Sequence, residues 1–160
     1  MNPVIVKQTA ILSAILGGIL GVLTLIPFVR NFSFMLLILC ISAVIIIYMK
    51  KNDLIGIIDV KEGAILGAII GFVSFIAFSI VFIPIAAIIG AMFKASYFGW
   101  LAMFLKSGFF VLVMLVIFLG ILSALMNAFS GLVTVYMYEI LSGVKKEDKK
   151  EENVDFEIKE

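Results

Sequence analysis

The polar side chains best placed to do chemistry lie within one apolar segment near the C-terminal end of the chain. They are Ser123, Asn127, Ser130 and Thr134. Their intervals of four, three and four residues place them on one face of a helix. An amide exposed to lipid is costly, so this face should meet other helices or water. We expect interhelical hydrogen bonding, and the alternative is a polar path or a binding site for a small polar molecule.

Residue types needed for enzyme chemistry are otherwise scarce. The chain has no His, which removes the commonest general base and metal ligand, and its single Cys excludes an internal disulfide framework. We expect Cys40 to behave as a small buried apolar side chain. Glu139 lies beside Tyr136 and Tyr138 and is expected to be a solvated carboxylate at the membrane surface, with coupling to a proton or cation as the alternative. We therefore expect no enzyme activity, no metal site and no cofactor.

Small residues recur at every fourth position in two other segments. They are Ser13, Gly17 and Gly21 in the first segment, and Gly63, Gly67 and Gly71 in the second. Helices in lipid associate by close van der Waals contact, which small residues permit. We expect the two segments to pack against each other through their glycines, and the alternative is that these residues line a pore.

The composition indicates where all these residues must lie. Hydrophobic residues make up 64% of the 160 positions and charged residues 14%, with a mean hydropathy of +1.26. Soluble domains are about 45–50% apolar and about 25% charged, so this chain is not an ordinary globular protein. Its formal net charge of +1 gives no electrostatic basis for binding nucleic acid. We expect the lipid bilayer to be its surroundings.

Charged residues divide most of the chain into uncharged runs of 22, 19, 31 and 32 residues. A helix needs about 20 apolar residues to cross a bilayer, so each run is long enough. The expected fold is all-α, a polytopic transmembrane helix bundle over residues 1–144 with spans at about 8–29, 33–49, 63–84 and 108–138. The last two runs are too long for one straight crossing, and Pro84 should interrupt the third. A cleaved signal peptide is the less favoured alternative for the first run, because it lacks a small-residue cleavage site.

The last 16 residues, 145–160, form a charged tail. It holds five Lys and seven acidic residues, and like charges fall four positions apart, which does not favour a helix. We expect the fourth span to end at Ser142 and Gly143, and the tail to be disordered and cytoplasmic. The alternative is that residues 154–158, which alternate apolar and acidic side chains, add as a strand to a partner's sheet.

Lysine and arginine are unevenly distributed between the two ends of the spans. Near the helix ends, six lie on the side that holds both termini, and three, namely Arg30, Lys94 and Lys106, lie on the other. Positive residues favour the cytoplasmic side, so we expect a multi-pass plasma-membrane protein with both termini in the cytoplasm. Aromatic residues between Lys94 and Lys106 indicate an interfacial segment. The alternative of a fifth span would bring Lys94 to the middle of the membrane.

An internal repeat relates residues 7–17 to residues 61–71, with seven of eleven positions identical at an offset of 54. Both copies enter the membrane from the same side, so they would belong to two parallel αα-hairpin repeats. The alternative is chance, because Ala, Ile, Leu and Gly dominate any such helix.

Residues 47–51 end a span with a Tyr and two basic residues, and residues 60–67 open the next span with the pattern Val-x-x-Gly-Ala-x-x-Gly. In this respect the chain resembles a diffuse group of small prokaryotic four-span membrane proteins, a likeness that implies an architecture and no activity. We expect a non-enzymatic membrane protein that acts through helix packing, as a homo-oligomer or with a membrane-protein partner. The alternative is a small transporter or channel, holin-like in size and charged tail, with a polar path along the fourth span.

Overall fold

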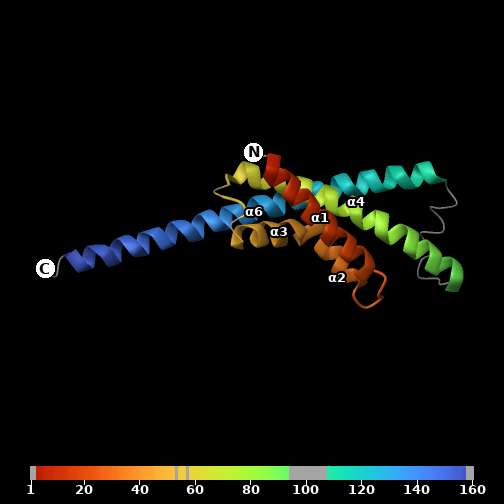
Figure 1. Ribbon diagram of the computed structural model, residues 1–160, viewed down its shortest axis with the longest axis horizontal. Coiled ribbons are helices and arrows are strands. Elements are labelled where there is room, and N and C mark those ends of the chain that lie inside the picture. The colour runs from red at the N-terminus through yellow and green to blue at the C-terminus, as the bar shows by residue number, and fades with distance from the viewer. Residues whose placement is uncertain (1–2, 53, 57, 94–107, 158–160) are drawn as a thin grey trace.

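A computed structural model of the chain describes residues 3–52, 54–56, 58–93 and 108–157, and every element within these ranges is a helix (Figure 1). The long helices are α1 (Pro3–Leu23), α4 (Val60–Phe93) and α6 (Phe109–Glu157). Between α1 and α4 lies one continuous helical stretch that consists of α2 (Arg30–Met35), the π-helical segment η1 (Leu36–Cys40) and α3 (Ile41–Lys51).

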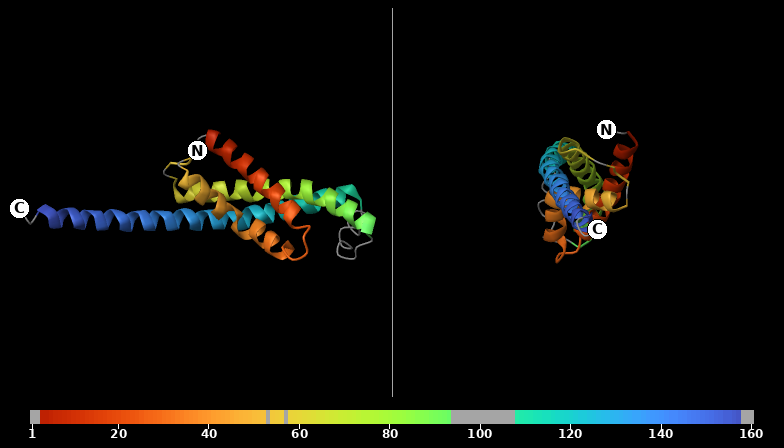
Figure 2. Two further views of the ribbon diagram at one scale, coloured as in Figure 1. Left: turned by 60° about the horizontal axis from the view of Figure 1, so that its bottom comes forward. Right: turned by 90° about the vertical axis from the view of Figure 1, so that its left-hand side faces the viewer.

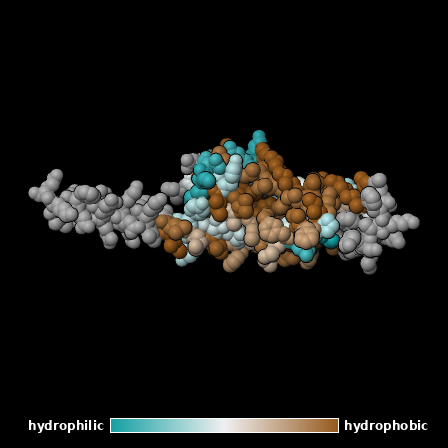
Figure 3. Space-filling view, turned by 90° about the horizontal axis from the view of Figure 1, so that it is seen from below, coloured by the Kyte–Doolittle hydropathy of each residue, from teal (hydrophilic) through white to brown (hydrophobic). Residues whose placement is uncertain are grey.

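Four helical stretches in the described residues are long and apolar enough to cross a membrane. They are Pro3–Leu23, Arg30–Lys51, Val60–Gly90 and Phe109–Leu141. The surface is also suited to a bilayer, because apolar side chains cover the middle of the visible face and hydrophilic residues gather toward its two ends (Figure 3). The prediction of an all-helical protein with four candidate spans is therefore confirmed.

The first helix is displaced toward the N-terminus relative to the predicted span. It begins at Pro3 and ends at Leu23, short of the expected limit at residue 29. Proline suits the first turn of a helix because its missing N–H would have no helical partner there. After the helix, the chain turns through residues 24–29, where the amide of Val29 donates to the carbonyl of Ile26 at 3.1 Å.

Two helices run further than the sequence suggested. α4 continues past Pro84 to Phe93, so the interruption expected at this proline is absent. Spanning helices tolerate proline because the freed carbonyl can find other partners. α6 continues past Ser142 and Gly143 to Glu157, and the backbone of most of the charged tail is helical where we expected disorder. Lys and Glu are strong helix formers, which favours continuation of a helix already begun.

The central helix of the bundle is α4, which packs along both α1 and α6 (Figure 2). The η1 and α3 segments pack against α6 and α4. The start of α1 and the loop after α3 lie at one end of the bundle, and the turn after α1 lies at the other (Figure 1). The core is formed by buried side chains of the second span and α4, among them Leu37, Ile41, Ile45, Leu66 and Ile70.

Three smaller expectations have different outcomes. Cys40 is exposed, so the expectation of a buried thiol is wrong; Leu37 and Ile41 fill the buried face of this span instead. The interfacial segment expected at residues 94–106 lies outside the described residues. The two copies of the sequence repeat lie in α1 and α4, and their origin by duplication stays a prediction.

Candidate functional site

The most unusual local structure is η1, a π-helical turn in the middle of the second span. A π-helical turn contains more than the usual 3.6 residues, so it interrupts the regular pattern in which each amide bonds to the carbonyl four residues earlier. Within a bilayer the groups released in this way must find other partners, because water is absent. Short π segments of this kind are frequent at functional sites.

The side chain of Asn127 on α6 supplies those partners. Its Nδ2 donates to the carbonyls of Leu37 and Ile38 at 3.0 and 2.9 Å, and its Oδ1 accepts from the amide of Ser42 at 3.0 Å. In an uninterrupted α-helix the Ser42 amide would bond directly to the Ile38 carbonyl. The Asn127 amide therefore lies between a donor and an acceptor of the second span and bonds to both.

Two serines extend this arrangement to a third helix. The hydroxyl of Ser42 donates to the backbone carbonyl of Asn127 at 2.8 Å. The hydroxyl of Ser123 donates to the carbonyl of Gly71 on α4 at 3.1 Å, and the Ser123 carbonyl accepts from Asn127 Nδ2 at 3.0 Å. We call Ser42, Ser123 and Asn127, with the backbone groups that they bond, the amide node. All three side chains are at most 1% exposed.

The remaining polar residues of the predicted stripe do not join the amide node. Thr134 donates from its hydroxyl to the carbonyl of Ser130 on the same helix at 2.8 Å, and both residues are half-buried. The structure thus divides the stripe into a buried half, Ser123 and Asn127, which bonds to other helices, and a half-buried portion in which Thr134 bonds within α6.

The glycines of α4 allow the close approach on which the amide node depends. A Cβ atom at Gly67 would overlap the backbone carbonyl of Asn127, and one at Gly71 would lie 2.6 Å from the carbonyl oxygen of Ser123. On the other side of this contact, a Cβ at Gly131 would lie 2.5 Å from the carbonyl oxygen of Gly63. Only residues without a side chain permit this separation of α4 and α6, and we call the contact the glycine seam.

The small residues of α1 face a different part of α4. A Cβ at Gly17 would overlap the backbone of Ser74, and one at Gly21 would lie 3.0 Å from the carbonyl oxygen of Phe78. Ser13 is fully buried on the same helix and bonds to the carbonyl of Thr9 at 2.6 Å. As expected, α1 packs against α4 through Gly17 and Gly21, but the expectation that Gly67 and Gly71 of α4 belong to the same contact is wrong, because they face α6. α4 is 34 residues long, so it can meet α6 along residues 63–71 and α1 further along its length.

The cytoplasmic end expected from the charge distribution contains one cation–aromatic contact. Lys50, at the end of α3, places its Nζ 5.1 Å from the centre of the Tyr138 ring on α6. An ammonium over an aromatic face is attracted by the ring quadrupole. This contact joins the second and fourth spans beyond the amide node. Glu139 lies on the exposed side of the same turn.

The hydrogen bonds of the amide node favour a structural role for its side chains over a catalytic one. Each polar atom of Asn127 and each serine hydroxyl of the node is bonded to another helix or to its own backbone. No group of three or more His, Cys, Asp or Glu residues that could hold a metal ion occurs in the described part of the chain. The sequence predicted that Asn127 points into the bundle. It did not predict η1, because the residues of this segment are all apolar apart from Cys40 and none of them indicates a π-helical turn.

Comparison with known proteins gives no further information on the site, since no family model, no curated protein and no solved structure matches this chain. The function must therefore be inferred from the geometry of the bundle itself.

Proposed function

We propose that this protein is a non-catalytic integral membrane protein of the plasma membrane that acts through contacts between α6 and a helix of another membrane-embedded chain. That chain is either a second copy or a different membrane protein. The observation that carries the proposal is the exposure of α6. Only 17% of its most apolar stretch is buried inside the bundle, compared with 28%, 39% and 33% of the corresponding stretches of the first, second and third spans.

The exposed side of α6 carries large apolar side chains in a regular order. They are Phe118, Leu122, Leu125, Phe129, Leu132 and Tyr136, each between 36% and 69% exposed. The intervals alternate between four and three residues, which is the spacing that brings one side of a helix repeatedly against a partner in left-handed packing. The opposite side of α6 is already occupied by the glycine seam and the amide node.

A small transporter or channel with a path along α6 is the competing function. It would use the polar stripe, whose most buried members are Ser123 and Asn127. Both are bonded to neighbouring helices and at most 1% exposed, so neither is available to a passing solute without breaking a contact of α6 with α4 or with the second span. We therefore favour helix contact over transport.

Cysteine cross-linking in native membranes tests the proposal. In a background in which Cys40 is replaced by Ser, single cysteines at Leu125 and Phe129, each labelled with a photoactivatable benzophenone, should form cross-linked species on irradiation. Ile80 and Ile88 on α4 serve as matched controls, because their side chains are 67% and 59% exposed, against 65% and 69% for the two α6 positions. Cross-links from α6 alone support the proposal. No cross-link from α6, or equal cross-links from both helices, would contradict it.

A further inference from the structure

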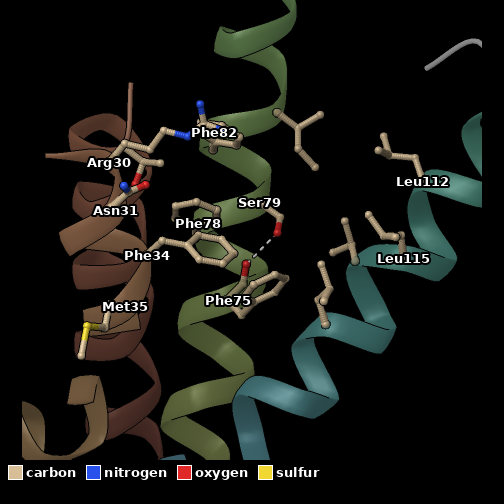
Figure 4. A pocket seen from close by; sticks show the side chains of 14 residues that line it. Arg30, Asn31, Phe34, Met35, Phe75, Phe78, Ser79, Phe82, Leu112 and Leu115 are labelled. Atoms are coloured by element: carbon tan, nitrogen blue, oxygen red, sulfur yellow. Dashed lines mark hydrogen bonds between the residues drawn. The ribbon is translucent and has the colours of Figure 1, made fainter. Parts of the chain in front are cut away.

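Beyond the glycine seam, α4 and α6 diverge and leave a half-open cavity of about 400 Å³ that is also bordered by α2 (Figure 4). The divergence begins where the ring of Phe72 lies against α6, 3.3 Å from the position of a Cβ at Gly120. The volume falls in the range of about 300–1,000 Å³ that is typical of small-molecule sites. A cavity of this size is therefore built into the end of the bundle opposite the termini.

The wall of the cavity is apolar and largely aromatic. Phe78 lies at its centre, 6.0 Å from the ring centre of Phe34, 6.0 Å from that of Phe75 and 5.2 Å from that of Phe82. The hydroxyl of Ser79, which also lines the cavity, donates to the carbonyl of Phe75 on its own helix at 2.9 Å. The interior is thus suited to a hydrocarbon chain and offers little to a polar solute.

Arg30 and Asn31 line one end of the cavity (Figure 4). Arg30 is the first residue of the second span, so its half-buried guanidinium lies at the level at which a bilayer changes from hydrocarbon to headgroups. No acidic residue precedes Asp53 in the sequence, and none lies between Glu62 and Glu139. The described residues therefore supply no carboxylate at this end of the bundle, where Arg30 is the only charged side chain among them.

We propose that this cavity binds one acyl chain of an anionic phospholipid whose phosphate is held by Arg30. A guanidinium presents a planar set of donors that suits the oxygens of a phosphate, and the bond is charge-assisted. The aromatic wall receives the hydrocarbon chain at the depth at which chains lie in the bilayer. A zwitterionic lipid offers the same phosphate, but its own cation would meet an end of the bundle that carries cations only.

The proposal requires that the helices span a bilayer, but not that α6 contacts another protein. If the α6 cross-links did not form, the proposed lipid site would still stand. If the lipid did not bind, the proposed helix contact of α6 would still stand. The two proposals are therefore separable by experiment.

Native mass spectrometry of the delipidated full-length chain tests the lipid site. The protein is titrated with phosphatidylglycerol or phosphatidylcholine that carry identical acyl chains. We expect one phosphatidylglycerol to bind about tenfold more tightly, because its headgroup brings no cation next to Arg30 and that of phosphatidylcholine does. Arg30→Gln should abolish this preference and Arg30→Lys should retain part of it. Lys7→Gln, a charge change at the opposite end of the bundle, should have no effect.

A pair of variants on α6 tests whether the lipid chain occupies the cavity. Val116 lines the cavity, and Val116→Phe should fill it and weaken the binding of both lipids. Ile121 is 51% exposed and does not line the cavity, so Ile121→Phe should leave binding unchanged. Thermal unfolding of each variant shows that a loss of binding does not arise from unfolding.

Three results would overturn the proposal. They are equal affinity of the unaltered chain for the two lipids, an unchanged preference in Arg30→Gln, and unchanged lipid binding in folded Val116→Phe. A second copy of the chain would be the occupant if the lipid-free protein formed a dimer that Val116→Phe abolished. If either variant failed to fold, Arg30→Ala and Leu115→Phe at the same cavity would replace them, with the same expected losses.

Discussion

At the scale of single residues, Asn127 should contribute most to the stability of the bundle, because its side chain bonds to three backbone groups of another span. Interhelical hydrogen bonds in membranes contribute about 0.6 kcal/mol each on average. Asn127→Leu removes three such bonds, so we expect the free energy of unfolding to fall by about 2 kcal/mol. Reversible unfolding in mixed detergent micelles, followed by circular dichroism, measures this loss.

Two serines of the second span provide the controls for that prediction. Ser42 and Ser33 are equally buried, but the hydroxyl of Ser42 donates to Asn127 and that of Ser33 has no partner among the described residues. Ser42→Ala should lower the free energy of unfolding by about 0.6–1.7 kcal/mol. Ser33→Ala should change it by less than about 0.5 kcal/mol, because no hydrogen bond is lost. Equal effects of both changes, or a neutral Asn127→Leu, would show that the amide node does not stabilise the bundle.

At the scale of helices, the glycine seam sets the distance between α4 and α6. A methyl group at Gly67 would overlap the carbonyl of Asn127, so Gly67→Ala should force the helices apart and cost about 1–3 kcal/mol of stability. Gly18 on α1 is the matched control, because its nearest neighbour, Val81 Cγ2, would lie 3.7 Å from the new Cβ. Gly18→Ala should be neutral or stabilise the protein by up to about 1 kcal/mol through helix propensity. If both changes have the same effect on thermal unfolding, the seam is not a close contact.

The same helices show what sequence can and cannot predict. The four spans follow from uncharged runs, and the inward position of Asn127 follows from the cost of an amide in lipid. The helices that face the glycines could not be assigned from the sequence. A stripe of small residues permits a close approach, but it does not specify which helix makes it. The π-helical turn at residues 36–40 could not be predicted either, since the side chain that bonds its carbonyls lies about 90 positions further along the chain.

At the scale of the whole molecule, the topology makes a prediction that does not depend on any detail of packing. Gly56 lies in the loop between α3 and α4, and Phe28 lies in the turn after α1, where it is 99% exposed. Four crossings and the bias of Lys and Arg predict that Gly56 lies in the cytoplasm and Phe28 on the opposite side.

Single cysteines at these two positions, in the Cys40→Ser background, test the topology. A membrane-impermeant maleimide added to intact cells should modify the cysteine at residue 28, and the one at residue 56 should react only after the membrane is opened. Labelling of both residues from one side would refute the four-span arrangement, and the reverse pattern would refute the orientation.

The π-helical turn has a consequence for the angular position of everything that precedes it. Each residue advances an α-helix by about 100°, and a π-helical turn takes up one extra residue without turning the helix further. If residues 36–40 became regular α-helix with no residue lost, Arg30 would turn by about 100° around the axis, away from the cavity that it now borders. Deleting one residue from 36–40 would instead restore the regular pattern and leave Arg30 close to its present position. The direction in which the only arginine of the chain points therefore depends on a π-helical turn whose Ile38 carbonyl accepts a hydrogen bond from Asn127, on a different helix.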